Sequence, residues 1–249
     1  MQYPRLIGHR CCRGLAPENT LAALEAAKQW GLTCVEFDVR LTRSGEVVVF
    51  HDDTLERTTN GKGALDDYTY AEVAALDAGT WFSASFVHEK IPLFSDYLKK
   101  IADAGLMANV EIKSLPGKEA QTASAVYEVL EAFKKSMQRD PSSMQDAVII
   151  SSFEVPALAW FHAQAPYYPL ALLLDTMRPD WLLLCESLNC KALHLSDAII
   201  TEDIAKAVKA ESQLQLAVYT VNDAERASQL WDWGVDAIFT DYPDRMAVD

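Results

Sequence analysis

Apolar, strand-like runs alternate with helix-like segments along the whole chain, and this order constrains the fold more than any other feature of the sequence. The strand candidates are rich in β-branched residues and cover 5–9, 33–39, 46–51, 107–113, 147–152, 168–174, 191–195, 214–220 and 235–240. The helix candidates have apolar residues at helical spacing and cover 18–30, 95–104, 118–138, 154–165, 180–187, 201–210 and 223–233. Because strand, helix and strand in succession form a parallel unit, we expect parallel strands joined by crossovers.

The length of 249 residues and this alternation favour a closed (β/α)8 barrel of the TIM type over an open, doubly wound sheet. The sequence has neither a glycine-rich dinucleotide loop after a strand nor a phosphate-binding loop of the G-x-x-x-x-G-K-S/T type. The segment 52–92 breaks the rhythm and is rich in Thr, Gly and Asp. We expect it to be an insertion after the second strand unit, within a single barrel domain over 1–249, with Trp81 and Phe82 in its own core.

The composition excludes several classes of protein. The formal net charge of −14 argues against a nucleic-acid binder or a protein that docks on anionic membranes, because both need a basic surface. No apolar run is long enough to span a membrane, and the N-terminus lacks the pattern of a signal peptide. Five cysteines without framework spacing fit a reducing compartment, so we expect a cytoplasmic protein. The sequence does not indicate an oligomeric state.

Acidic residues lie on the faces of two predicted strands. Strand side chains alternate, so Glu36 and Asp38 point to one face, as do Asn109, Glu111 and Lys113 on another strand. A strand of a parallel sheet is normally apolar on both faces, and buried carboxylates are unfavourable without a partner. A divalent cation is a suitable partner, and oxygen ligands favour Mg²⁺ or Ca²⁺, with Mn²⁺ also acceptable.

Further polar residues follow the carboxyl ends of other predicted strands, where barrel enzymes carry their active sites. His9 and His51 have side chains that titrate near neutrality and suit acid–base catalysis. Arg10 and Lys113 suit phosphate binding, and a metal with two histidines and two cations suits the cleavage of a phosphodiester. Later strand ends offer candidate pocket residues, namely Phe153, His194, Tyr219 and Asp241. We expect Phe153 and Tyr219 to contact the substrate.

Other interpretations of the same residues remain open at this point. Glu36 alone would fit one half of a buried ion pair with Arg10 or Lys113, and a single histidine is more often structural. Lys113 would also suit Schiff-base chemistry without a metal. A non-catalytic barrel that binds a phosphorylated ligand is a further alternative, and His194 fits either barrel packing or pocket lining.

Taken together, these residues resemble those of the glycerophosphodiester phosphodiesterases. The resemblance covers nearly the whole chain, in the ordered segments Gly8-His9-Arg10, Leu15 to Leu21, Glu36-Phe37-Asp38, Gly45 to Asp52, Leu55 to Gly61, Asn109 to Lys113, Val218 to Asn222 and Gly234 to Asp241. The segments Ser151 to Glu154 and Leu193 to Leu195 are most similar to the cytosolic bacterial type.

The resemblance implies a TIM barrel with a small insertion and metal-dependent hydrolysis of deacylated phospholipid head groups. The products would be glycerol 3-phosphate and an alcohol, which places the enzyme in lipid and glycerol metabolism. By match of motif, the acid–base pair would be His9 and His51, the metal ligands Glu36, Asp38 and Glu111, and the phosphate contacts Arg10 and Lys113. A related phospholipase-type activity on intact lipids is less favoured, because the chain lacks an amphipathic basic helix.

The sequence departs from the family pattern directly after Arg10. The family usually has glycine there, whereas this chain has Cys11 and Cys12. Glycine adopts positive φ easily and cysteine does not, so the geometry of this turn is an open question. We expect at least one of the two thiols to lie near the cleft.

Overall fold

The protein forms a closed barrel of eight parallel strands in a computed structural model that describes residues 2–136 and 147–246. The barrel strands are β1 (Leu6–Gly8), β2 (Cys34–Leu41), β4 (Met107–Ile112), β5 (Val148–Ser152), β6 (Leu170–Leu174), β7 (Ala192–Ser196), β8 (Gln215–Tyr219) and β9 (Ala237–Thr240). Strand β1 pairs in parallel with both β2 and β9, which closes the ring. The predicted TIM barrel is therefore confirmed.

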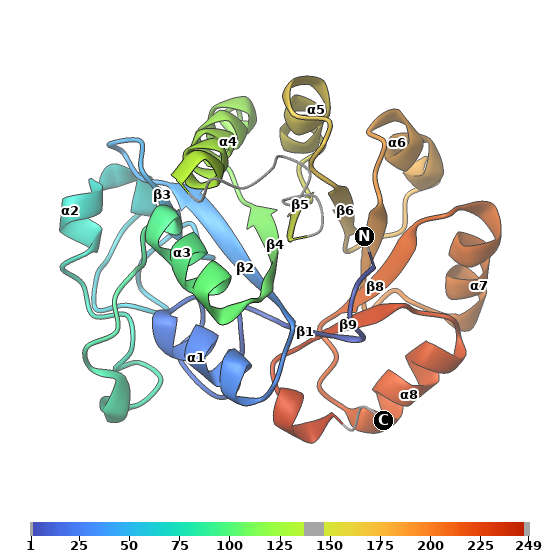
Figure 1. The fold of residues 1–249 in the computed structure, drawn as a ribbon, viewed down its shortest axis with the longest axis horizontal. Coiled ribbons are helices and arrows are strands. Elements are labelled where there is room, and N and C mark those ends of the chain that lie inside the picture. The colour runs from blue at the N-terminus through green and yellow to red at the C-terminus, as the bar shows by residue number, and fades with distance from the viewer. Residues whose placement is uncertain (1, 137–146, 247–249) are drawn as a thin grey trace.

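Helices surround the strands on the outside of the barrel (Figure 1). They are α1 (Leu21–Gln29), α3 (Phe94–Ala104), α4 (Glu119–Ser136), α5 (Val155–Gln164), α6 (Trp181–Ser187), α7 (Glu202–Glu211) and α8 (Ala224–Asp232). Among the helices, the first residue differs most from the prediction at α1, which was expected to begin at residue 18. It begins later because the Thr20 side chain accepts a hydrogen bond from the Ala23 amide and caps the helix there. The last two residues of the helix predicted over 118–138 lie outside the described residues.

Strand β3 (Val47–Val49) is the exception to the parallel order. It pairs antiparallel with β2, from Val39 opposite Val49 to Leu41 opposite Val47, and lies outside the ring in Figure 1. The expectation that every strand is parallel is wrong here, because only a tight turn with Gly45 at positive φ separates the two strands. A turn of this length permits a hairpin and no crossover.

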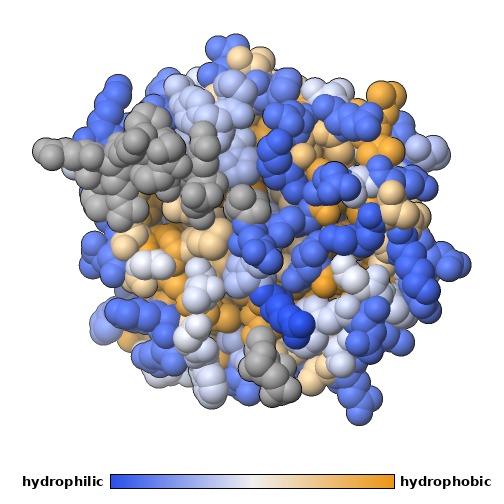
Figure 2. All heavy atoms as spheres, turned by 45° about the vertical axis from the view of Figure 1, so that its right-hand side comes forward, coloured by the Kyte–Doolittle hydropathy of each residue, from blue (hydrophilic) through white to orange (hydrophobic). Residues whose placement is uncertain are grey.

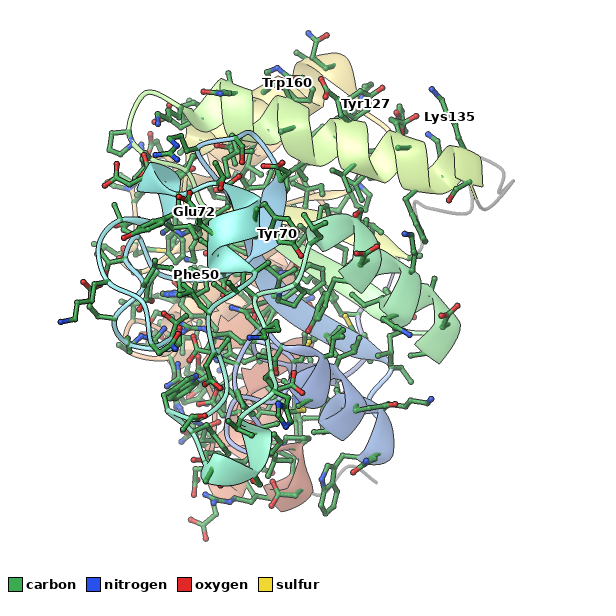
Figure 3. All side chains as sticks on the ribbon, turned by 90° about the vertical axis from the view of Figure 1, so that its left-hand side faces the viewer. Phe50, Tyr70, Glu72, Tyr127, Lys135 and Trp160 are labelled. Carbon is green, nitrogen blue, oxygen red and sulfur yellow. The ribbon has the colours of Figure 1, made fainter. Side chains whose placement is uncertain are left out.

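The segment between β3 and α3 holds only short elements, η1 (Leu65–Asp67), α2 (Tyr70–Val73) and η2 (Ala84–Phe86), on the side of the molecule seen in Figure 3. Its own apolar cluster consists of Val48, Phe50, Leu55, Leu65, Val73, Ala78 and Ile91. Trp81 stacks edge-on against Phe82 at 5.7 Å between ring centroids, but it is 38% exposed. The expectation that this pair forms the core of the segment is therefore wrong.

The strands separate two apolar layers because their side chains alternate. On β2, Val35, Phe37 and Val39 face outward and pack beneath the helices, in the larger cluster of buried residues. The inner cluster fills one part of the barrel interior and consists of Tyr3, Ile7, Cys34, Ile149, Ala171, Ala192, Ala217, Ala237 and Phe239. Four alanines in this set leave room for the Tyr3 ring inside the barrel, so the polar residues at the other end of β2 and β4 stand on a packed floor.

Hydrophilic side chains cover most of the face that carries α6 to α8, with smaller apolar areas between them (Figure 2). Within residues 2–136 and 147–246, no helix combines the length and the apolarity needed to cross a bilayer.

The helix layer gives a matched test of the packing. Leu98 of α3 is 2% exposed and Leu183 of α6 is 67% exposed. We expect Leu98→Ala to lower the free energy of unfolding by about 2–5 kcal/mol, because it removes buried methyl groups and leaves a cavity. Leu183→Ala is expected to change it by less than about 0.5 kcal/mol. Urea denaturation followed by circular dichroism measures both, and equal effects would contradict this assignment of faces.

Candidate active site

Three carboxylates meet inside the mouth of the barrel, at the carboxyl ends of β2 and β4. The strand register places Asp38 opposite Glu111, and Glu36 lies two residues before Asp38 on the same face. All three side chains are buried, and one ligand oxygen of each lies within 4.8 Å of the others. The predicted clustering of these acids is therefore present in the fold.

The environment of Glu36 fits a bound cation. Its Oε2 accepts a hydrogen bond of 2.8 Å from the Arg10 backbone amide, while its buried Oε1 has no hydrogen-bond partner. Burial, together with repulsion from Asp38 and Glu111, raises the pKa of Glu36 well above its usual value. An all-oxygen set with an unpartnered buried oxygen is suited to a hard divalent ion, so the residues fit the metal that the sequence predicts.

The other two acids are partly neutralised by cations. Burial acts to raise the pKa of Asp38, but Lys113 and Arg10 outweigh it and hold this pKa below its usual range. Burial raises the pKa of Glu111 to about 7, although its ion pair with Lys113 opposes the shift. Within the described residues, no side-chain ion pair involves Glu36, so the alternative of a structural pair with Arg10 or Lys113 is not supported.

His9 follows β1 directly and is held by a carboxylate from the other end of the chain. Its Nδ1 lies 2.7 Å from Asp241 Oδ1, and Asn222 Nδ2 donates to the second oxygen of Asp241 at 2.8 Å. An ionised carboxylate only accepts hydrogen bonds, so Nδ1 carries the proton and Nε2 has a free lone pair. Burial lowers the pKa of His9, and the hydrogen bond to Asp241 partly offsets this effect.

His51 follows β3 and has the same kind of partner. Its Nδ1 lies 2.5 Å from Asp52 Oδ1, and Arg57 holds Asp52 through Nε at 2.6 Å and Nη2 at 2.8 Å. Burial lowers the pKa of His51, while nearby Asp38 opposes that change. Both histidines therefore have an Nε2 that is free to exchange a proton.

Glu18 connects the two sides of the mouth. It accepts from Arg10 Nη1 at 2.5 Å and from Arg57 Nη1 and Nη2 at 2.8 and 2.7 Å. Burial acts to raise the pKa of Glu18, but the two guanidinium groups lower it below the usual value. Through Arg57 and Asp52, Glu18 links the turn after β1 to His51.

The turn after β1 keeps the conformation that suits glycine. Arg10 has φ of 46° and Cys11 has φ of 68°, both in the left-handed region. Cys11 is fully buried and its Sγ lies 2.9 Å from the Tyr97 hydroxyl, on the outer side of the barrel wall. Neither Cys11 nor Cys12 lines the cleft, although the Cys11 backbone amide donates to the carbonyl of the lining residue Glu36 at 2.8 Å.

The cleft has a volume of about 220 Å³ and two unlike walls. One wall is polar and holds His9, Arg10, Glu36, His51, Glu111 and Lys113. The other is apolar, with Phe153 edge-on to Tyr219 at 5.9 Å and the Lys113 ammonium 5.4 Å above the Phe153 ring. The Tyr219 hydroxyl is buried and has no hydrogen-bond partner. His194 lies below the cleft, with Nε2 2.8 Å from the Tyr3 hydroxyl, so it belongs to the barrel packing.

Comparisons with known proteins agree with this geometry. The model of the "Glycerophosphoryl diester phosphodiesterase family" matches residues 9–245. A glycerophosphodiester phosphodiesterase of Bacillus altitudinis is 34% identical over 97% of this chain and 96% of its own length.

The chain belongs to the glycerophosphoryl diester phosphodiesterase family.

It is thus an enzyme of the phosphodiesterase class. Among solved structures, an Oleispira antarctica phosphodiesterase in complex with the product sn-glycerol-3-phosphate has a TM-score of 0.90 and 34% identity, with 98% of this chain and 95% of that chain covered. A glycerophosphodiester phosphodiesterase of Caldanaerobacter subterraneus is 32% identical over 97% of this chain and 95% of its own length.

Four residues around the phosphodiesterase site have roles that the sequence does not indicate. Asp241 is expected only as a pocket residue at a strand end, with no role beside His9, and no role is predicted for Glu18, Arg57 or Arg13. Arg13 lines the cleft, and its Nε lies 3.5 Å from Asp241 Oδ1. The available signal was the position of Glu18 and Arg57 inside the family segments, but residue type alone does not reveal a contact between distant parts of a chain.

The Glu18 bridge predicts a pH-dependent stability. A carboxylate whose pKa is lowered by folding stabilises the protein above its unfolded pKa of 4.5, and this contribution is lost as the pH falls through the lower folded value. We expect Glu18→Gln to destabilise the protein by about 2 kcal/mol or more near pH 7, because Arg10 loses its buried counter-charge.

The difference between wild type and Glu18→Gln should shrink as the pH falls from the unfolded pKa through the lower folded pKa, below which the wild-type carboxyl is neutral in both states. Urea midpoints measured by circular dichroism over this pH range test the idea, with Glu25→Gln on the exposed side of α1 as the matched control. A difference that is independent of pH would contradict it.

Proposed function

We propose that the protein hydrolyses glycerophosphodiesters to glycerol 3-phosphate and an alcohol, with a divalent metal and a pair of histidines. The observation that carries the proposal is the buried carboxylate cluster beside two histidines that are each held by an aspartate. The Oleispira antarctica relative, described with the product sn-glycerol-3-phosphate, supports the same substrate class.

Glu36, Asp38 and Glu111 would hold the metal ion, as Mg²⁺, Ca²⁺ or Mn²⁺. When bound, the ion supplies electrostatic stabilisation for the negative charge that develops on the phosphoryl oxygens. The bound ion would also compensate the negative charge of the three acids, which otherwise opposes the approach of an anionic phosphodiester.

His9 and His51 would act as the acid–base pair. In each case the carboxylate at Nδ1 fixes the tautomer and turns Nε2 toward the cleft, where it accepts a proton from the nucleophile or, once protonated, gives one to the leaving alcohol. The nucleophile is either water or a neighbouring substrate hydroxyl. In the second case a cyclic glycerophosphate accumulates early in the reaction, which product analysis at short times distinguishes.

Arg10 and Lys113 would contact the phosphate. Glu18 holds the Arg10 side chain in place from behind, and Lys113 lies against Asp38 at 3.6 Å. Arg10 is buried, Lys113 is half-buried, and ion pairs hold both in place, so they would stabilise charge in the transition state with little further desolvation. Phe153 and the unpartnered Tyr219 hydroxyl would form the substrate-binding wall on the opposite side.

The alternatives have weaker physical support. Burial lowers the pKa of Lys113, but Glu111 and Asp38 raise it above its usual value, so the amine stays protonated and is a poor Schiff-base nucleophile. A phosphate-binding barrel without catalysis does not need two histidines with carboxylate partners. A phospholipase-type activity needs a surface that docks on lipid, and the negative net charge opposes this on anionic membranes.

We also propose that the chain acts as one barrel domain over 1–249, with 52–92 as an insertion within it, and works in the cytoplasm on a small soluble substrate. The five cysteines are free and buried, which fits a reducing compartment. The charge of −14 supports the expectation that neither nucleic acid nor membrane is a partner.

Histidine substitution tests the acid–base pair. We expect His9→Ala and His51→Ala each to lower kcat by at least ~10²-fold, because general acid–base transfer is lost. His88→Ala, at an exposed position of the 52–92 segment, is the matched control and should retain normal activity. A coupled assay for glycerol 3-phosphate measures all three, and near-normal turnover of either cleft variant would remove that histidine from the mechanism.

Chelation tests the metal. Activity should disappear with EDTA and return with Mg²⁺, Ca²⁺ or Mn²⁺, and the divalent ion should raise the melting temperature of the wild type because it binds only the folded state. Glu36→Gln should abolish this thermal shift, whereas Glu25→Gln on α1 should keep it. Full activity in EDTA together with no thermal shift would exclude a metal enzyme.

A further inference from the structure

A second cavity lies beside the catalytic cleft, with a volume of about 120 Å³. It is enclosed by the end of β2, the segment after β4, the start of α4 and part of the 52–92 segment. Lys113 lines both this cavity and the cleft, so the two spaces are adjacent across one side chain. We call it the basic cavity because of the residues that surround it.

More cations than carboxylates line the basic cavity. Its lining includes four cations, Arg40, Arg43, Lys113 and Lys118, and two carboxylates, Asp53 and Asp66. The chain itself has a net charge of −14. Each of these cations has a carboxylate partner, so an anionic ligand must replace a partner to bind; the pairs are Arg40–Asp53, Arg43–Glu72, Lys113–Glu111 and Lys118–Asp66.

Two of the cations are available to a ligand. Arg43 Nη2 lies 3.2 Å from Glu72 Oε2, and Lys118 Nζ lies 3.2 Å from Asp66 Oδ2. These pairs are partly exposed and screened by solvent, so they contribute little and exchange easily for another anion. Glu72 is labelled in Figure 3, on the side of the molecule that also carries α4.

Arg40 has a different role in the same wall. Its Nε donates to the His51 carbonyl at 2.7 Å and its Nη1 lies 2.5 Å from Asp53. Its side chain is mostly buried, so it supports the loop that carries His51 and is not free to move to a ligand. The recognition of a ligand in the basic cavity therefore depends on Arg43 and Lys118.

We propose that the basic cavity is the subsite for an anionic group, a carboxylate or a phosphate, on the alcohol half of the diester substrate. This inference rests on the proposed function. With the phosphodiester against Arg10 and Lys113, the substituent that passes Lys113 enters the basic cavity. A negative group there meets Arg43 and Lys118, whereas a purely cationic head group meets repulsion.

The test uses two substrates that differ by one carboxylate, glycerophosphoserine and glycerophosphoethanolamine. In the full-length protein with its metal, Lys118→Ala and Arg43→Ala should each lower kcat/KM for glycerophosphoserine about tenfold, through KM, because a charge-assisted contact to the bound substrate is lost. The value for glycerophosphoethanolamine should stay within about twofold. Lys118→Arg should retain most of the wild-type kcat/KM for glycerophosphoserine.

Lys206→Ala is the matched control, because it removes one positive charge from a surface ion pair on α7. It should affect neither substrate. Equal changes for both substrates in the Lys118 and Arg43 variants, or no change for either, would overturn the subsite while leaving the proposed function intact. A wild type that hydrolyses neither substrate would remove both.

Inhibition by inorganic phosphate tests whether the basic cavity binds a free anion or the head group of the substrate. If the cavity binds a separate phosphate ion, phosphate should inhibit the hydrolysis of both substrates, Lys118→Ala should weaken that inhibition, and the head-group preference should be unchanged. That combination would overturn the assignment. Loss of preference for glycerophosphoserine alone, without a change in phosphate inhibition, supports it.

Discussion

The repulsion among Glu36, Asp38 and Glu111 is the constraint on which the rest of the site depends. Three carboxylates within 4.8 Å of one another and out of contact with bulk water are unstable unless cations surround them. The fold places Lys113, directly after β4, and Arg10, in the turn after β1, beside the acids, and it leaves one buried oxygen of Glu36 without a partner. This unpartnered oxygen and the remaining negative charge make the cluster suitable for a divalent ion, because a fully neutralised site would attract a cation only weakly.

The two histidines likewise depend on neighbouring polar and charged groups that hold them in place. Each needs a carboxylate at Nδ1 to fix its tautomer, and each carboxylate needs a donor that holds it, Asn222 behind Asp241 and Arg57 behind Asp52. Arg57 comes from the 52–92 segment and also binds Glu18, which in turn binds Arg10. The segment outside the barrel thus orients His51 and, through Glu18, the Arg10 side chain. Its apolar cluster includes Val48 of β3, which fixes the segment against the barrel and keeps Asp52 and Arg57 in place.

The sequence predicts the strands, the helices and the convergence of the acids, because these follow from periodicity and from the rule that barrel sites lie at strand ends. Other features depend on contacts between distant residues. His9 and Asp241 are 232 positions apart, and only closure of the ring through β1 and β9 brings them to 2.7 Å. The antiparallel pairing of β3 depends on the turn before it, and the exposure of Trp81 depends on how the 52–92 segment packs. The spacing of apolar residues in the sequence specifies neither. Cys11 keeps the left-handed conformation because its side chain gains a buried contact with Tyr97, an interaction that the substitution of glycine by cysteine does not reveal.

The distribution of charge connects these local features with the behaviour of the whole molecule. A net charge of −14 repels an anionic substrate at long range, but this field is screened within about 8 Å at physiological ionic strength. Within that distance, Arg10 and Lys113 place positive charge in a cleft with one apolar wall, where a lower local dielectric strengthens each electrostatic interaction. The charges at the mouth of the barrel therefore act on a ligand there more strongly than distant surface charges do. The same reasoning applies to the three acids, because their negative charge opposes Arg10 and Lys113 unless a cation or protons compensate it.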